Sequence, residues 1–257
     1  MRFSSELQID GLPQPGIRHL SALRSFDWLK AGWSDLRANP LPSLAYGLLF
    51  ALGGDLILLS LLDHPHLFTV ALSGFFLLAP LLAAGLYELS RRHAAGQHPL
   101  FIDTLSCYRS NGESLAMFGL MLALLMLLWE RFSAVAFALL SGGGAFSGSA
   151  LLTEIILSGE HLPFVLTWLV MGGLLAALVF SLAVVAVPMM LDRQTDVVTA
   201  MATSLRATLA NPLPLLVWAA VIVTLTLLGF ATLLFGLVVI MPILGHASWH
   251  AYRDLVE

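Results

Sequence analysis

Three ionisable residues fall inside long apolar stretches of the sequence, where a charge is costly. They are Asp55, Glu130 and Arg131. At 1.5 Å per residue, Asp55 and Arg131 lie at similar depths, roughly 24 to 30 Å from the starts of their helices. We predict that these two residues pair across two helices and that Glu130 faces another helix or the outer interface. A static ion pair and a pathway for protons or ions are both open interpretations.

Histidines form two further groups with ligand chemistry. His246 and His250 are four residues apart, so they share one face of a helix, a geometry that suits a metal or haem contact. Trp249 and Glu88 are candidate neighbours of that site. A second, weaker group has donors that suit copper or zinc and comprises His64, His66, Glu160 and His161. Hydrogen bonding at the membrane interface is the alternative for both groups, and we expect no bound cofactor.

The motifs of several common enzyme classes are absent from the sequence. It contains no His-Glu-x-x-His, no Cys-x-x-Cys and no Gly-x-Ser-x-Gly. Cys107 is the single cysteine, which excludes an intramolecular disulfide. The net charge is -4 without a long basic tract, so no nucleic-acid partner is indicated. We therefore expect a protein that is not an enzyme.

The elements that position these residues must be membrane helices. Hydrophobic residues make up 58% of the chain and charged residues 11%, whereas an ordinary soluble domain has about 25% charged residues. Several apolar runs reach the roughly 20 residues that a helix needs to cross a bilayer. We predict an all-α fold with six transmembrane helices, over residues 41–62, 67–89, 114–140, 163–190, 213–228 and 231–250. The last two divide one long apolar stretch at Gly229.

Lysine and arginine residues predict the orientation, because positive residues near short loops stay in the cytoplasm. They precede the first span, lie between the second and third and between the fourth and fifth, and follow the sixth. Only Arg131 departs from this pattern. Both ends of the chain are therefore predicted to lie in the cytoplasm. Aromatic and basic residues expected to contact lipid at the inner interface are Trp28, Trp33, Arg37, Arg91 and Arg92.

A short motif recurs before two of the predicted spans. Ala38-Asn39-Pro40-Leu41-Pro42 returns as Ala210-Asn211-Pro212-Leu213-Pro214, and a weaker copy surrounds Asn111. Asparagine followed by proline is typical of a helix start, with the asparagine side chain capping free backbone amides. Each copy therefore predicts the start of a membrane span. Three prolines in even-numbered spans, Pro80, Pro188 and Pro242, predict kinks or local unwinding.

An amphipathic segment precedes each copy of the motif. In the first, Leu23, Phe26, Leu29, Trp33 and Leu36 recur at helical spacing, opposite Arg24, Asp27, Lys30 and Asp35. Such a helix is expected to lie along the membrane surface. We predict a polar segment, residues 1–20, and one membrane domain, residues 21–257. The domain would contain three pseudo-repeats of an interfacial helix and two spans, over residues 21–93, 100–193 and 197–257.

Four stretches of the sequence carry a resemblance to a known family. They are Trp28–Leu36, Pro80 with Gly85–Arg92, Pro188–Arg193 and Gly245–Arg253. Together they resemble a bacterial family of integral membrane proteins of unknown function, some members of which are labelled cytochrome c oxidase subunits. The resemblance implies a bacterial inner-membrane protein but no activity. The chain lacks the large set of intramembrane histidines that a haem-copper catalytic subunit needs.

Three functions follow from these features. The first is an accessory or assembly component of a larger membrane complex, for example a respiratory oxidase, that acts through helix packing. The second is a small transporter or channel that uses Asp55 and Arg131. The third is haem or metal binding through His246 and His250. We rank the accessory component first, because few groups with catalytic chemistry are present.

Overall fold

The computed structural model describes residues 15–63, 82–140 and 162–257. Helices make up most of these ranges, and their only β contact is an isolated antiparallel bridge between Ile17 and Val256. The predicted all-α class is therefore confirmed. The predicted kink at Pro80 lies outside the described residues.

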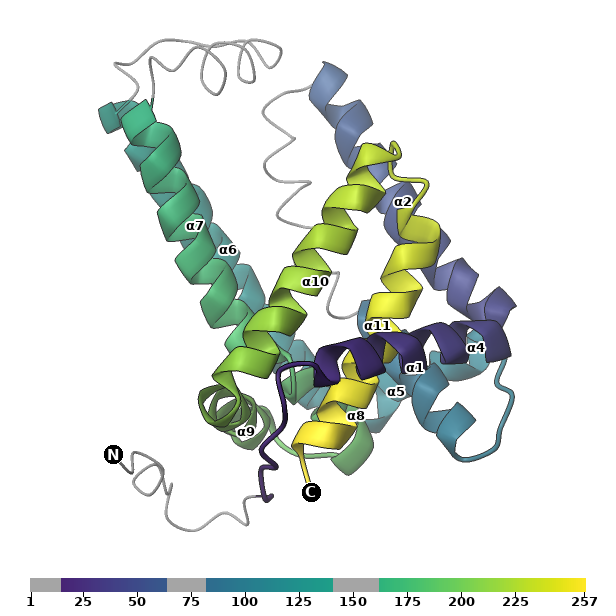
Figure 1. Ribbon diagram of the computed structural model, residues 1–257. Helices are drawn as coiled ribbons and strands as arrows, with labels where there is room; N and C mark the ends of the chain where they lie inside the picture. Colours follow the sequence, from purple (N-terminus) through teal and green to yellow (C-terminus); the bar gives the residue numbers. More distant parts are fainter. Residues whose placement is uncertain (1–14, 64–81, 141–161) are drawn as a thin grey trace.

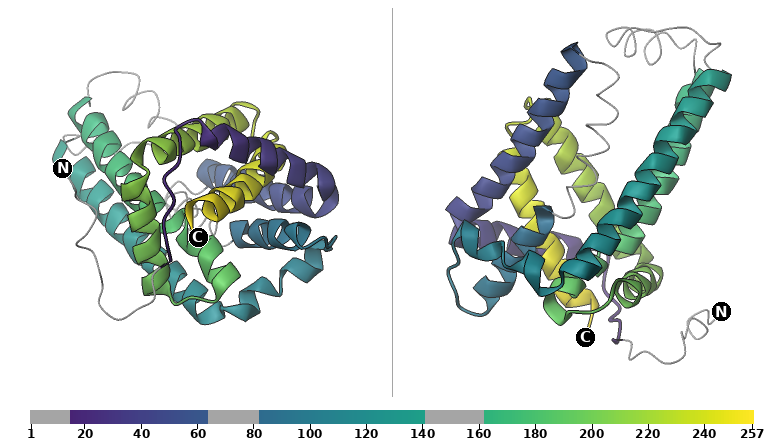
Figure 2. Two further views of the ribbon diagram at one scale, coloured as in Figure 1. Left: turned by 60° about the horizontal axis from the view of Figure 1, so that its bottom comes forward. Right: turned by 180° about the vertical axis from the view of Figure 1, so that it is seen from behind.

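Long helices rise from a common base (Figure 1). They are α2 (Pro40–Asp63), α6 (Gly112–Leu140), α7 (Leu162–Ala183), α10 (Pro212–Ala231) and α11 (Leu237–Leu255). Helices α6 and α7 lie together along one flank, and α2 lies on the opposite flank (Figures 1 and 2).

Four stretches of the described chain are long and apolar enough to cross a membrane. They are Pro40–Ile57, Gly112–Leu140, Leu162–Arg193 and Pro212–Ala231. They correspond to the first, third, fourth and fifth predicted spans. The second predicted span, residues 67–89, lies largely outside the described residues, which include a helix over residues 82–94. The sixth corresponds to α11, which is a helix but is not among these four.

Shorter helices lie across the base of the molecule (Figures 1 and 2). They are α1 (Arg24–Ala38), α4 (Phe101–Thr104), α5 (Cys107–Ser110) and α9 (Val197–Ala210). Helices α1, α5 and α9 each lead into a long helix through one asparagine. The φ and ψ angles are -131° and 64° at Asn39, -145° and 48° at Asn111, and -130° and 55° at Asn211. The same backbone bend therefore joins a base helix to a rising helix at all three places.

The predicted role of the asparagine side chain in capping is wrong for Asn211, which makes no side-chain cap bond to α10. Its amide instead binds another part of the chain. Oδ1 accepts a hydrogen bond from the Leu20 amide at 2.8 Å, and Nδ2 donates to the Arg18 carbonyl at 2.9 Å. The asparagine at this bend thus connects two segments that are distant in sequence.

The break in the fourth predicted span confirms the effect expected of Pro188. Helix α7 ends at Ala183 and α8 (Ala186–Arg193) follows, with the break just before the proline. Proline disrupts the helix one turn before it, since it clashes with the carbonyl four residues back. The Ser204 hydroxyl of α9 binds backbone groups at this break. It accepts a hydrogen bond from the Val185 amide at 3.1 Å and donates one to the Ser181 carbonyl at 2.7 Å. By contrast, Pro242 lies inside the continuous helix α11.

The last long apolar stretch divides slightly later than predicted. Helix α10 ends at Ala231, two residues beyond Gly229, and α11 begins at Leu237. The turn between them holds Leu233 and Leu234 at φ values of 51° and 66°. The Thr232 hydroxyl donates to the Gly229 carbonyl at 2.8 Å and accepts from the Gly236 amide at 2.8 Å, which closes the turn.

The face of α1 that packs inside the protein is not the apolar face of the sequence pattern, whose contact with the membrane surface stays a prediction. Trp28, Gly32, Asp35 and Leu36 are buried, whereas Leu23, Phe26 and Trp33 are exposed. Helix α1 packs closely on α11. The approach is so close that a Cβ atom at Gly32 would lie 2.5 Å from the Ile243 carbonyl oxygen. The predicted apolar face therefore points largely outward, and Asp35, predicted on the polar face, is inside.

The main buried core lies at the base, and the rising helices expose apolar side chains. Large aromatic residues of this core are Trp28, Trp218, Trp249 and Tyr252. No residue of α7 is buried, and its exposed apolar side chains include Leu166, Leu169, Val170 and Leu174. A large exposed apolar surface is typical of contact with lipid or with another membrane protein.

Candidate functional site

A buried polar cluster lies at the base, where α1, α2, the helix over residues 82–94 and α11 meet. We call it the serine-histidine cluster, and it comprises Asp35, Ser43, Ser90, His246 and His250. Asp35, Ser43, Ser90 and His246 are 5%, 0%, 1% and 0% exposed. His250 is half-buried and connects the cluster to the surface. Polar groups buried to this extent must find hydrogen-bond partners within the protein.

Both ring nitrogens of His246 have serine partners. Nε2 lies 2.9 Å from Ser43 Oγ of α2, and Nδ1 lies 2.7 Å from Ser90 Oγ. A metal or haem iron would need one of these nitrogens, so its binding would break a hydrogen bond inside the protein. Among the described residues, no group of three or more histidine, cysteine or acidic side chains is arranged to hold a metal ion.

Asp35 is the carboxylate that joins the two histidines. Its Oδ2 accepts a hydrogen bond from the Ser90 hydroxyl at 2.6 Å and lies 2.9 Å from His250 Nε2. His93 Nε2 lies 3.9 Å from Oδ1. Burial alone would raise the pKa of Asp35, but the hydrogen bonds from His250 and Ser90 outweigh it, so the pKa lies below its usual range. Asp35 is therefore ionised at neutral pH.

The charge of the His246 ring depends on which acceptor the Ser43 hydroxyl donates to. Ser43 Oγ lies 2.7 Å from the Asn39 carbonyl and 2.9 Å from His246 Nε2, and it has one proton to donate. If Ser43 donates to Asn39, Nε2 must donate to Ser43. Since the Ser90 proton goes to Asp35, Nδ1 must donate as well, and the ring is then a cation. If Ser43 turns to donate to Nε2, the ring is neutral.

Ion pairs surround the cluster and involve several residues predicted from the sequence. Glu88 lies with its carboxylate against Arg91, at 2.7 Å, and against Arg92, at 2.5 Å. The Glu88 carboxylate pairs with its own helix, and the prediction that Glu88 neighbours His246 and His250 stays a prediction. The ion pairs with the buried Glu88 carboxylate therefore orient the side chains of Arg91 and Arg92. Contact of these two arginines with lipid stays a prediction.

Trp28 was predicted to contact lipid at the inner interface, but it lies inside the protein. It is 1% exposed, packs edge-on against Trp218 with ring centroids 5.8 Å apart, and donates from Nε1 to Asp254 at 2.8 Å. Its place in the core follows from the packing of α1 on α11. Trp33 and Arg37 are exposed, so a contact with lipid stays a prediction for these two residues.

The predicted pair of Asp55 with Arg131 is not formed. Arg131 Nη2 instead lies 3.2 Å from Oε1 of its neighbour Glu130. Asp55 belongs to α2 and Arg131 to α6, on opposite flanks of the molecule (Figures 1 and 2). Equal depth in the membrane did not imply adjacency around the bundle. The weaker donor group, His64, His66, Glu160 and His161, lies outside the described residues.

Sequence reasoning found His246 and His250 but missed Asp35, Ser43 and Ser90 as their partners. A signal was present for two of them. Asp35 lies in Trp28–Leu36 and Ser90 in Gly85–Arg92, two of the stretches that carry the family resemblance. Ser43 follows the Asn-Pro motif directly and had no chemical signal of its own.

The comparison with known families agrees with the membrane fold. Residues 67–192 match the model of a family described as a predicted integral membrane protein, DUF2189. The predicted resemblance to an integral membrane family of unknown function is therefore confirmed, whereas this description contains no reference to an oxidase. No curated protein and no solved structure gives a significant match.

Proposed function

We propose that this protein, whose residues 67–192 match the model of a family of integral membrane proteins, is a non-catalytic accessory or assembly component of a larger membrane complex. The observation that carries the proposal is the closed hydrogen bonding of His246. Its ring is fully buried and both nitrogens bind serines of the same chain. The group with the most evident chemistry is thus used to hold helices together, which favours a role through packing.

The apolar surface of the rising helices supports the same proposal. Helix α7 packs against α6 and has no buried residue, so one side of it faces outward. Leu169, Val170 and Leu174 on α7 are 57%, 60% and 61% exposed. In a bilayer, such a surface contacts lipid or packs against a helix of another protein, and the proposal assigns it the second role. A respiratory oxidase is one such complex, as the label on some family members suggests.

The finer topology belongs to the same proposal. The chain would form six spans in a bacterial inner membrane, with both ends in the cytoplasm. The order of elements supports three units of a base helix followed by two rising helices: α1, α2 and residues 82–94; α4 and α5, α6 and α7; α9, α10 and α11. The shared bend at Asn39, Asn111 and Asn211 supports their common origin as repeats.

The two alternative functions have less support. A transporter would use Asp55 and Arg131, which lie on opposite flanks of the molecule. Haem or metal binding would use His246, which would first have to release a serine partner. Neither alternative has a specific geometric observation in its favour.

The test is purification from native membranes in mild detergent, with mass spectrometry of the polypeptides recovered in stoichiometric amounts. We expect at least one membrane-protein partner. Leu174→Trp on α7 should reduce its recovery, whereas Leu216→Trp, at a similarly exposed position on α10, should not. Recovery of the chain alone would overturn the proposal.

A further inference from the structure

The chain contains three asparagines, and each lies at one of the bends that join a base helix to a rising helix. At Asn211, Nδ2 donates to the Arg18 carbonyl at 2.9 Å, in the segment before α1. At Asn111, Nδ2 donates to the carbonyls of Met190, at 3.0 Å, and Thr195, at 2.8 Å, in the chain that leads to α9. We call such a contact, from the asparagine of a bend to main-chain carbonyls before a base helix, a clasp.

The two clasps follow a cyclic order of the base helices. Asn111 joins α5 to α6, and it holds the segment before α9, the next base helix in the chain. Asn211 joins α9 to α10, and it holds the segment before α1, the first base helix. Asn39 joins α1 to α2, and the next base helix is α4. The order therefore predicts that Asn39 holds the segment just before α4, residues 97–99.

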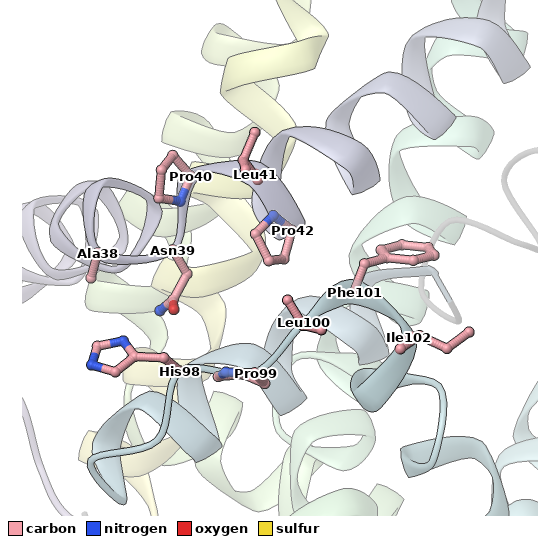
Figure 3. A pocket seen from close by; sticks show the side chains of 10 residues that line it. All are labelled: Ala38, Asn39, Pro40, Leu41, Pro42, His98, Pro99, Leu100, Phe101 and Ile102. Atoms are coloured by element: carbon pink, nitrogen blue, oxygen red, sulfur yellow. The ribbon is translucent and has the colours of Figure 1, made fainter.

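Asn39 faces this segment across a pocket. The asparagine is 5% exposed, and among the described residues its Nδ2 is buried without a hydrogen-bond partner. The residue lines a pocket of about 540 Å³ between the start of α2 and residues 98–102. Figure 3 shows its amide pointing towards His98 and Pro99. A buried donor without a partner is unfavourable, so contact with an acceptor of this segment would stabilise the protein.

The segment has an acceptor that can bind Asn39 without the loss of another bond. The amides of Gln97 and Leu100 already donate to acceptors of the same chain, at 3.0 and 2.9 Å. The His98 carbonyl belongs to a peptide plane between these two amides, and that plane has no N–H because the next residue is Pro99. Among the described residues, no donor binds this carbonyl. The His98 carbonyl is therefore the acceptor that costs least to move.

The ends of the segment are suited to a small movement of its middle. It begins after Gly96, which has a φ of 75° and where a Cβ atom would meet nothing within 4 Å. Glycine adopts such a conformation readily and can also leave it. The segment ends at α4, which is joined to α2 by a 2.7 Å hydrogen bond between Tyr46 Oη and Thr104 Oγ1. One end is thus a hinge, and the other is fixed to the helix that begins beside Asn39.

We propose that residues 97–99 form a strap that closes on Asn39, with Nδ2 donating a hydrogen bond to the His98 carbonyl. This bond completes a ring of three clasps, in which each base helix is held by the asparagine of the preceding bend. The pocket is the open state of the third clasp, and closure fills the part of it next to His98 and Pro99. The ring involves this chain alone, so it does not depend on the proposed function.

The direct test is solid-state NMR of the protein in lipid bilayers, with ¹⁵N in the asparagine side chains and ¹³C in the histidine carbonyl carbons. A hydrogen bond places Nδ2 within about 4 Å of the His98 carbonyl carbon, so we expect a strong dipolar coupling between the two labels. His98→Gln keeps the main chain but removes the ¹³C label at this position, and it should abolish that coupling. A coupling that persists in His98→Gln, or a distance beyond about 5 Å, would overturn the inference.

Melting temperatures give a second measurement with a matched control. Asn39→Ala should lower the melting temperature by roughly 2 to 4 °C, the effect of one lost buried hydrogen bond in a protein of this size. Asn111→Ala, which removes a clasp that is closed in the structure, should lower it by at least as much. An unchanged or higher melting temperature for Asn39→Ala would mean that its amide has no bond to lose, and the strap would then not close.

Discussion

At the scale of the residue, the serine-histidine cluster concentrates four buried polar side chains in one place. Each is held by a partner from a different helix, so the cluster specifies how the helices meet. A hydrogen bond in such an environment is stronger than in water, and the loss of one partner leaves others unpaired. The half-buried His250 has a smaller share of this effect, because water can replace its bond to Asp35.

His246→Ala and His250→Ala make the same chemical change four residues apart on α11. We expect His246→Ala to lower the free energy of unfolding by about 2–4 kcal/mol, because Ser43 and Ser90 each lose one buried hydrogen bond and a cavity opens. His250→Ala should cost about 1 kcal/mol. Denaturant titration in detergent micelles measures both. Equal losses would contradict the assignment of His246 to the centre of the cluster.

Only part of the cluster could be predicted, because its residues lie far apart in the sequence. The spacing of His246 and His250 predicted a shared face because it is local to one helix. Asp35 and Ser90 approach His246 from helices far away in the sequence, and periodicity contains no information on which helices meet. The same limit explains the wrong pairing of Asp55 with Arg131. Depth along a helix can be counted from a sequence, whereas position around a bundle cannot.

At the scale of the element, α11 is the helix on which α1 and α2 pack. Both contacts depend on a glycine. A Cβ atom at Gly32 of α1 would lie 2.5 Å from the Ile243 carbonyl oxygen, and one at Gly47 of α2 would overlap the Val238 carbonyl. Backbones that approach this closely leave no room for a side chain. These glycines set the distance of α1 and α2 from α11.

Gly47→Ala and Gly173→Ala should therefore have opposite effects. We expect Gly47→Ala to destabilise the protein by about 1–3 kcal/mol, because α2 must move away from α11. A Cβ atom at Gly173 of α7 would meet no other atom within 4 Å, so alanine should stabilise the helix by up to about 1 kcal/mol. Thermal unfolding of the two variants in the same detergent measures the difference. Destabilisation by both would show that glycine serves another purpose in these helices.

Element positions were predictable where a local rule sufficed. The Asn-Pro motifs marked the starts of α2 and α10, and Pro188 marked the break before α8. The burial of Asp35 was not predictable, because it depends on the close contact of α1 with α11 at Gly32. Helix α11 is a mixed case: its length was nearly right, but polar residues in its second half, such as Ser248 and Arg253, make it less apolar than the four stretches identified as candidate spans.

At the scale of the whole molecule, the base and the rising helices differ in character. The base holds the main core, the serine-histidine cluster and the ion pairs of Glu88 and Asp254. The rising helices expose leucine, valine and phenylalanine. This division agrees with an integral membrane protein whose rising helices cross the bilayer. That the base lies at the cytoplasmic surface stays a prediction.

Single cysteines in a Cys107→Ser background test that orientation. Leu233→Cys lies in the turn between α10 and α11, where Leu233 is 76% exposed, and Glu257→Cys lies at the exposed base. In intact cells, a membrane-impermeant maleimide should label position 233, and it should reach position 257 only after the membrane is permeabilised. The reverse pattern would invert the topology, and labelling of both positions in intact cells would contradict a membrane between them.

The central place of α11 also has a consequence for biosynthesis. Its residues follow those of α1 by about 200 positions, which at about 5–20 residues per second corresponds to roughly 10 to 40 s of translation. During that interval Asp35, Ser43 and Ser90 are already made but lack His246. The hydrogen-bond network of these side chains can therefore be completed only after nearly the whole chain has been synthesised.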